Sequence, residues 1–107
     1  MGVYTHTMNG VLTAFTVPTG KNKTKSSAFA KAFYGQETSS HHGKYRYRRR
    51  GFLDDVPYNK LIRGVIIIQN EDLMQVLEFL NQYSANYHIR VVELTKEDRK
   101  AMRLTTE

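Results

Sequence analysis

The fold is decided by residues 65–80, which read VIIIQNEDLMQVLEFL. The stretch begins with four aliphatic residues, Val65 to Ile68, and such a run is typical of a central strand that is buried on both faces. After Asn70, apolar residues take the i, i+3, i+4 and i+7 positions of one helix face, and they are Leu73, Val76, Leu77 and Leu80. The stretch therefore predicts a buried strand followed by an amphipathic helix.

The residues that follow predict one more strand and one more helix. Residues 87–94 have the pattern of a last strand, which completes a strand-helix-strand unit over residues 63–94. Residues 95–104 predict a short C-terminal helix, because Thr95 and Asp98 have the spacing of a capping box.

The residues before the stretch predict a lysine-rich loop, a helix and a second loop. The helix is expected within residues 26–34, with Phe29 and Phe33 four positions apart on its buried face. The polar segment of residues 36–43 is expected to be a loop.

A strand is expected next, over residues 44–52, and a turn or loop over residues 54–59. Alternation in this strand places Tyr45 and Tyr47 on one face and Lys44, Arg46, Arg48 and Arg50 on the other. We count it as the second core strand of the sheet.

Asn9-Gly10 predicts a tight turn near the N-terminus. The pair separates residues 3–8 from residues 11–17, both rich in β-branched and aromatic side chains, and Asn-Gly suits the positive φ angles of a type I′ turn. We therefore expect a hairpin over residues 3–17.

The predicted order of elements indicates an α+β fold. Without the first hairpin strand and the last helix, the order is β-α-β-β-α-β, the plan of a ferredoxin-like split βαβ sheet. The expected fold is that sheet with an extra N-terminal hairpin strand and a short C-terminal helix. An open sheet of this kind also suits a homodimer, formed through a sheet face or an edge.

The composition is typical of one globular domain. The chain has 107 residues, of which 40% are hydrophobic, enough for one modest core. It has no cysteine, which excludes disulfides, thiolate nucleophiles and thiolate zinc sites. The sequence has no signal peptide pattern and no apolar run of membrane-spanning length, so we expect a cytoplasmic protein without a membrane partner.

The positive charge lies in one internal block, residues 21–50. This block holds nine of the sixteen Lys and Arg residues and one acid, Glu37, which gives a net charge of +8. The first twenty residues contain no Lys, Arg, Asp or Glu, and residues 51–107 hold seven basic and nine acidic residues. A positive field concentrated in this way is what a polyanion-binding surface requires.

Residues 44–50, which read KYRYRRR, combine the two side-chain types that hold unpaired nucleic acid. Lys and Arg neutralise phosphates, and Tyr rings stack on bases of any sequence. We therefore expect RNA or single-stranded DNA as the partner. The expected binding residues are Lys21, Lys23, Lys25, Lys44, Tyr45, Arg46, Tyr47, Arg48, Arg49 and Arg50.

Two other interpretations of this strand stay open. In the first, Tyr45 and Tyr47 are core residues and the Arg row is a solubilising face. In the second, the basic face binds acidic surfaces of other proteins.

Residues 50–52, Arg-Gly-Phe, resemble the start of the RNP1 motif of RNA-recognition motif proteins, which share the ferredoxin-like plan. The likeness ends there, because Leu53-Asp54-Asp55 follow where that motif has a small residue, an aromatic and an aliphatic. We therefore assign no family and give Phe52 no stacking role.

The loop around His41 and His42 supports an alternative hypothesis, in which the protein is a small nuclease or another nucleic-acid-processing enzyme. Either imidazole would act as the acid or base in phosphodiester cleavage, with neighbouring Arg groups stabilising the phosphorane charge. Adjacent histidines in a loop point in different directions, so we expect no metal site there. No cofactor is expected, and Mg²⁺ enters only with the nuclease alternative.

Asp54 and Asp55 follow the basic strand and have two interpretations. They would hold a divalent ion near a bound phosphate, or they would form a turn and pair with neighbouring arginines. We favour the second, because adjacent acids are common in turns.

Overall fold

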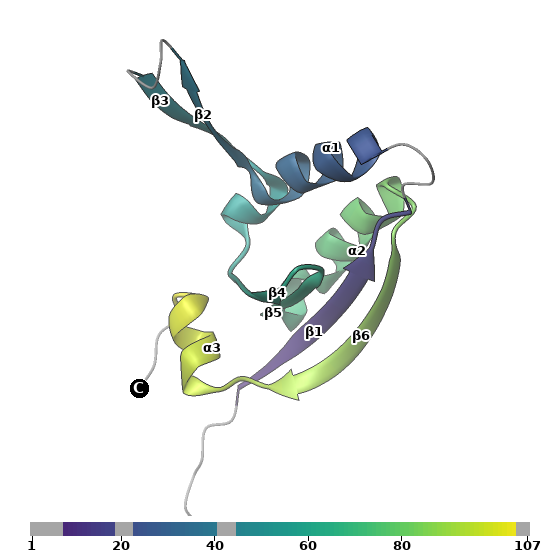
Figure 1. Ribbon diagram of the computed structural model, residues 1–107. Helices are drawn as coiled ribbons and strands as arrows, with labels where there is room; N and C mark the ends of the chain where they lie inside the picture. Colours follow the sequence, from purple (N-terminus) through teal and green to yellow (C-terminus); the bar gives the residue numbers. More distant parts are fainter. Residues whose placement is uncertain (1–7, 19–22, 41–44, 105–107) are drawn as a thin grey trace, which may run out of the picture.

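The computed structural model describes residues 8–18, 23–40 and 45–104 (Figure 1). Within these ranges the elements are β1 (Asn9–Thr16), α1 (Lys23–Tyr34), β2 (Gln36–Ser40), β3 (Tyr45–Arg49), β4 (Tyr58–Ile62), β5 (Val65–Gln69), α2 (Leu73–Gln82), β6 (Asn86–Glu93) and α3 (Lys96–Ala101). Two 3-10 turns, η1 (Phe52–Asp55) and η2 (Asn70–Asp72), precede β4 and α2. The fold is α+β, as predicted. Among the described residues, no helix has the length and apolar character needed to cross a membrane.

Four strands form the main sheet, in the order β4-β5-β1-β6, and every neighbouring pair is antiparallel. β5 lies inside this sheet, and its Ile66, Ile67 and Ile68 side chains are all buried. Successive side chains of a strand point to opposite faces, so burial of all three requires cover on both sides of the sheet. The prediction of a strand buried on both faces is confirmed.

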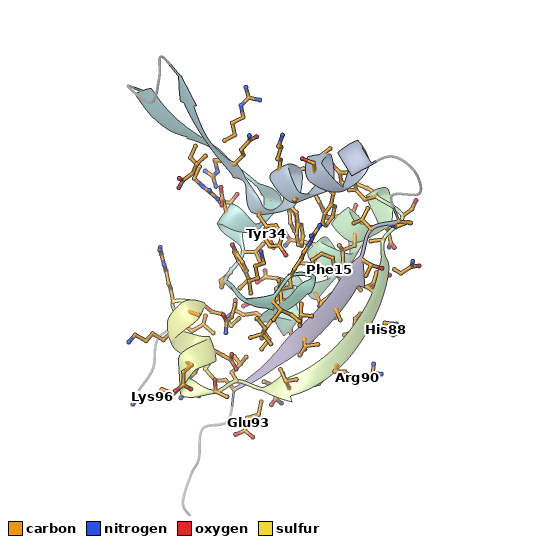
Figure 2. The ribbon with its side chains drawn as sticks, viewed as in Figure 1. Phe15, Tyr34, His88, Arg90, Glu93 and Lys96 are labelled. Atoms are coloured by element: carbon orange, nitrogen blue, oxygen red, sulfur yellow. The ribbon has the colours of Figure 1, made fainter. Side chains whose placement is uncertain are left out.

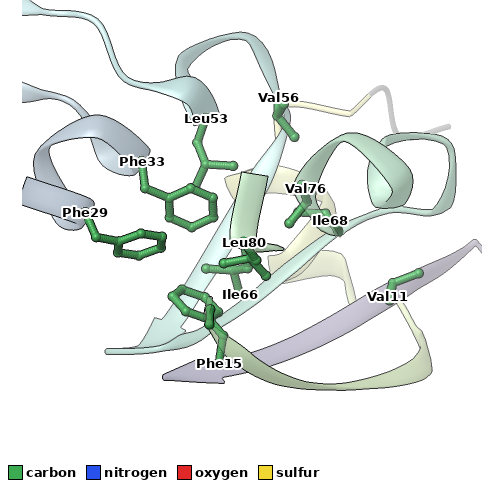
Figure 3. Close-up of a cluster of buried hydrophobic side chains, with 11 residues drawn as sticks. Val11, Phe15, Phe29, Phe33, Leu53, Val56, Ile66, Ile68, Val76 and Leu80 are labelled. Atoms are coloured by element: carbon green, nitrogen blue, oxygen red, sulfur yellow. The ribbon is translucent and has the colours of Figure 1, made fainter. Parts of the chain in front are cut away.

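α1 and α2 cover one face of the main sheet (Figure 1), where their apolar side chains meet those of β1 and β5 (Figure 3). Phe29 and Phe33 of α1 stack with their ring centroids 5.0 Å apart, as the i, i+4 spacing predicts. Phe33 also stacks on Phe79 of α2 at 5.3 Å. Aromatic pairs at such separations stabilise the fold by about 0.5–1.5 kcal/mol beyond the burial of their area.

α3 covers part of the opposite face, where Leu94 and Met102 pack against β5. The predicted capping box is confirmed: the Asp98 amide donates to Thr95 Oγ1 at 3.0 Å, and the Thr95 amide donates to Asp98 Oδ2 at 2.9 Å. Asn59 Nδ2 donates to Asp98 Oδ1 at 2.8 Å, which joins α3 to β4. Burial would raise the pKa of Asp98, but these hydrogen bonds outweigh it and lower the pKa.

The prediction of a tight turn at Asn9-Gly10 is wrong. Both residues lie in β1, and Gly10 pairs with β5 on one side and with β6 on the other. The glycine serves close packing instead, because a Cβ there would lie 2.5 Å from Leu94 Cδ2 and 3.0 Å from the Ile68 carbonyl oxygen. Because β5 and β6 occupy both sides of β1, the expected hairpin over residues 3–17 is wrong as well, and residues 3–7 lie outside the described residues.

The second core strand is also not the predicted one. The sequence predicts that residues 44–52 enter the main sheet, but β4 takes that place. The first two residues of β4 fall within the turn predicted over residues 54–59. Only Arg63 and Gly64 join β4 to β5, and Gly64 has a φ of +83°, so a tight hairpin brings the two strands together.

β3 instead pairs with β2 in a separate two-stranded sheet. The segment predicted as a polar loop, residues 36–43, therefore contains a strand. The β2–β3 hairpin projects from the body of the molecule (Figure 1), so its strands do not join the main sheet.

The packing at Gly10 can be tested by a double-mutant cycle with Leu94. Gly10→Ala should lower the free energy of unfolding by about 1–3 kcal/mol, because the new methyl group overpacks the β1–β6 end of the sheet. In a Leu94→Ala background the same change should cost less, since the side chain that it meets is gone. Urea unfolding of the four proteins measures this coupling. An identical cost in both backgrounds would contradict the contact.

Candidate nucleic-acid interface

The basic block of the sequence contains the β2–β3 hairpin. In its register, Glu37 pairs with Arg48, Ser39 with Arg46 and Ser40 with Tyr45. The hairpin projects from the end of α1, away from the main sheet (Figure 1). β3 alone, Tyr-Arg-Tyr-Arg-Arg, carries three of the block's nine basic residues.

Arg48 fixes the base of this hairpin to the body. Its Nη2 donates to the carbonyl oxygen of Tyr34 at 2.8 Å and to Asp54 Oδ1 at 2.5 Å. Tyr34 is the last residue of α1 (Figure 2), where unpaired carbonyl groups give the helix end a partial negative charge that a guanidinium complements. The other carboxylate oxygen of Asp54 accepts from the Gly51 amide at 3.0 Å.

Two glycines allow the hairpin base to approach α1 this closely. Gly35 has a φ of +92°, and a Cβ there would lie 2.6 Å from Arg48 Nη2. A Cβ on Gly51 would overlap the backbone nitrogen of Gly35. Backbone therefore lies against backbone at this junction, and only residues without a side chain fit.

Opposite charge stabilises the ionised forms of the Arg48–Asp54 pair. The hydrogen bond from Arg48, followed by that from the Gly51 amide, lowers the pKa of Asp54 below its ordinary range. The same bond raises the pKa of Arg48. The pair is half-buried, with side chains that are 44% and 19% exposed. Arg50 also forms an ion pair, with Asp55, but these side chains are 68% and 75% exposed.

The two acids after β3 thus bind arginines, as we predicted when favouring a turn with Arg partners. Within the described ranges, no group of three or more His, Asp or Glu side chains is placed to hold a metal ion. Arg49 is exposed, and the ion pairs of the described residues do not include it.

The other expected binding residues are distributed over three places. Lys23 and Lys25 lie in the first turn of α1, and Tyr45, Arg46 and Tyr47 lie in β3. Lys21 and Lys44 lie outside the described residues. So do His41 and His42, the two histidines of the nuclease alternative. The nuclease alternative therefore stays a prediction.

Phe52, to which we gave no stacking role, is partly buried and packs against the core. Its ring stacks on Phe79 with 4.8 Å between centroids and lies parallel to Phe33 at 6.1 Å. η1, which Phe52 begins, is thereby held against the helices, and the hairpin starts from a fixed point.

A groove that sequence reasoning missed lies beside the hairpin base. It has a volume of about 750 Å³, and its lining includes Arg48, Asp54, Asp55, Tyr58, Met102 and Arg103. One wall comes from the segment after β3 and the other from the end of α3. The two walls are about fifty residues apart in the sequence, so no local pattern could have joined them.

The structural role of Asp54 can be tested through its pH dependence. A carboxylate whose pKa is lower in the folded state adds stability that is complete above its unfolded pKa of about 3.9 and is lost as the pH falls through the folded pKa. Asp54→Asn should therefore lower the thermal midpoint at pH 7, and the difference from the wild type should vanish in strong acid.

Asp55→Asn is the matched control for this experiment. Its ion pair is exposed, so its loss should change the midpoint little at any pH. Equal effects of the two substitutions at pH 7 would contradict the role of Asp54 at the hairpin base.

No protein-family model, curated protein or solved structure matches the chain, so its function has to be argued from this site.

Proposed function

We propose that the protein binds RNA or single-stranded DNA and that the β2–β3 hairpin is its binding arm. One observation carries the proposal: the most basic strand of the chain lies in a hairpin outside the main sheet. The two β3 side chains whose burial the structure describes, Arg48 and Arg49, are exposed, which leaves them available for binding.

The basic residues of the block are assigned to two different roles, according to whether they already have an acidic partner. Arg48 has a carboxylate and a carbonyl as partners, so we assign it to positioning the arm. Arg50 has Asp55 as a partner. Contacts to phosphates are assigned to Arg46 and Arg49, with Lys44, Lys21, Lys23 and Lys25 as further candidates.

Tyr45 and Tyr47 favour an unpaired strand over a duplex. A two-stranded ribbon also fits the major groove of DNA, and positive charge alone would serve both partners. Aromatic rings stack on bases only where the bases are unpaired, and two tyrosines alternate with the arginines here. Tighter binding to duplex than to single-stranded DNA would argue against this choice.

For the body, we propose the ferredoxin-like split βαβ plan, with the β2–β3 hairpin inserted between α1 and β4. The support is the order β4-β5-β1-β6, its antiparallel pairs, and one helix in each of the two connections that lead from β1 to β4 and from β5 to β6. The body would then be a scaffold and the insertion the functional part.

The proposal is tested by replacing the two arginines assigned to phosphates. Each phosphate contact with a single strand releases counterions and adds about 0.7 to the steepness of the plot of log K against log salt. At 0.1 M salt this corresponds to roughly a fivefold gain in affinity for each contact. Arg46→Ala/Arg49→Ala should therefore weaken binding of a labelled oligonucleotide of about twelve nucleotides roughly 25-fold and reduce the slope by about 1.4. Fluorescence anisotropy at several salt concentrations measures both.

Arg63→Ala/Arg90→Ala is the matched control, because it removes the same charge and side chains from the β4–β5 turn and from β6. Both control residues are exposed. Arg90 lies on β6, far from the hairpin (Figure 2). If the control double variant loses as much affinity as Arg46→Ala/Arg49→Ala, the hairpin is not the binding arm.

A further inference from the structure

The groove beside the hairpin base has one unpaired charge among its described lining residues, and that charge is Arg103. The two carboxylates of the groove, Asp54 and Asp55, already bind Arg48 and Arg50. Arg103 is exposed, and it has no ion-pair partner within the described ranges. The wall formed by α3 therefore presents a positive group across from β3.

The backbone at Arg103 has a conformation that favours glycine. Its φ is +58°, and it follows the last turn of α3, where the Leu104 amide donates to the carbonyl of Arg99 at 2.9 Å. This is the usual position of a C′ glycine, because a Cβ is unfavourable in the left-handed region. Arginine at this position lowers the stability of the fold, so its side chain is expected to serve another purpose.

Ser84 has the same conformation at the end of α2, which makes it a control for the backbone effect. Its φ is +55°, and the Ala85 amide donates to the carbonyl of Leu80 at 3.0 Å, the same bond as at α3. Ser84 does not belong to the groove lining.

We propose that Arg103 is a second anchor for the single-stranded nucleic acid, and this inference rests on the proposed function. A strand bound along β3 continues past Arg48 into the groove, where Arg103 binds one of its phosphates. Tyr58, which lines the same groove and is partly exposed, gives the adjacent sugar and base an aromatic surface. The binding surface thus extends from the hairpin to the end of α3.

Arg103→Gly separates a binding role from a structural one, because the two roles predict opposite effects. Glycine suits the left-handed position, so the thermal midpoint should stay the same or rise. The affinity for a labelled single strand of about twelve nucleotides should fall roughly fivefold at 0.1 M salt, and the salt slope should decrease by about 0.7. Arg103→Lys, which keeps the charge, should retain most of the slope.

Ser84→Gly should raise the midpoint in a similar way and leave affinity and slope unchanged. If Arg103→Gly binds like Ser84→Gly while Arg46→Ala/Arg49→Ala is weakened, the second anchor is overturned and the hairpin proposal stands. If the wild type binds neither RNA nor single-stranded DNA, both are overturned.

Discussion

Burial of β5 on both faces is the constraint on which the rest of the fold depends. Ile66 and Ile68 need apolar cover on one side of the sheet, and Ile67 needs it on the other. α1 and α2 provide the first cover with their aromatic side chains, and Leu94 and Met102, which flank α3, provide the second. A single strand thereby determines where all three helices pack.

The chain between α1 and η1 lies outside the main sheet, and it returns to the core at Leu53 and Val56. It leaves the body as the β2–β3 hairpin, held at its base by Arg48, Asp54 and two glycines. A fixed base and a projecting basic strand together make an arm of defined position. Rigid positioning lowers the entropy lost on binding, which is how the body would contribute to the affinity of the proposed binding arm.

The residues with strong periodicity were predictable, because local spacing alone determines what they do. The run Val65–Ile68, the Phe29 and Phe33 pair, and the Thr95–Asp98 capping box all occur as their patterns indicate. Gly10 was misassigned because a glycine required by a neighbouring side chain has the same local sequence as a glycine required by a turn. β4 was missed because the alternation of residues 44–52 is the stronger strand pattern, so that segment was assigned to the main sheet. The local signal for β4 was Gly64, which forms the turn between β4 and β5.

The candidate site was predictable only in part, since its contacts cross long distances in the sequence. The charge block identified β3, and adjacent acids after it suggested Arg partners. Nothing local could show that Arg48 would bind the end of α1, or that Arg103 would stand across a groove from it. Such pairings depend on how the elements pack, which becomes visible only in the folded chain.

The central claim is that the hairpin binds and the body supports it. The most direct measurement is an amide NMR titration of ¹⁵N-labelled protein with a single-stranded oligonucleotide of about twelve nucleotides. We predict that shifts and line broadening concentrate in β2, β3 and the groove that Arg103 lines, and that β6 is unaffected. Perturbations centred on His88 and Arg90 of β6 (Figure 2), with an unchanged hairpin, would contradict the claim.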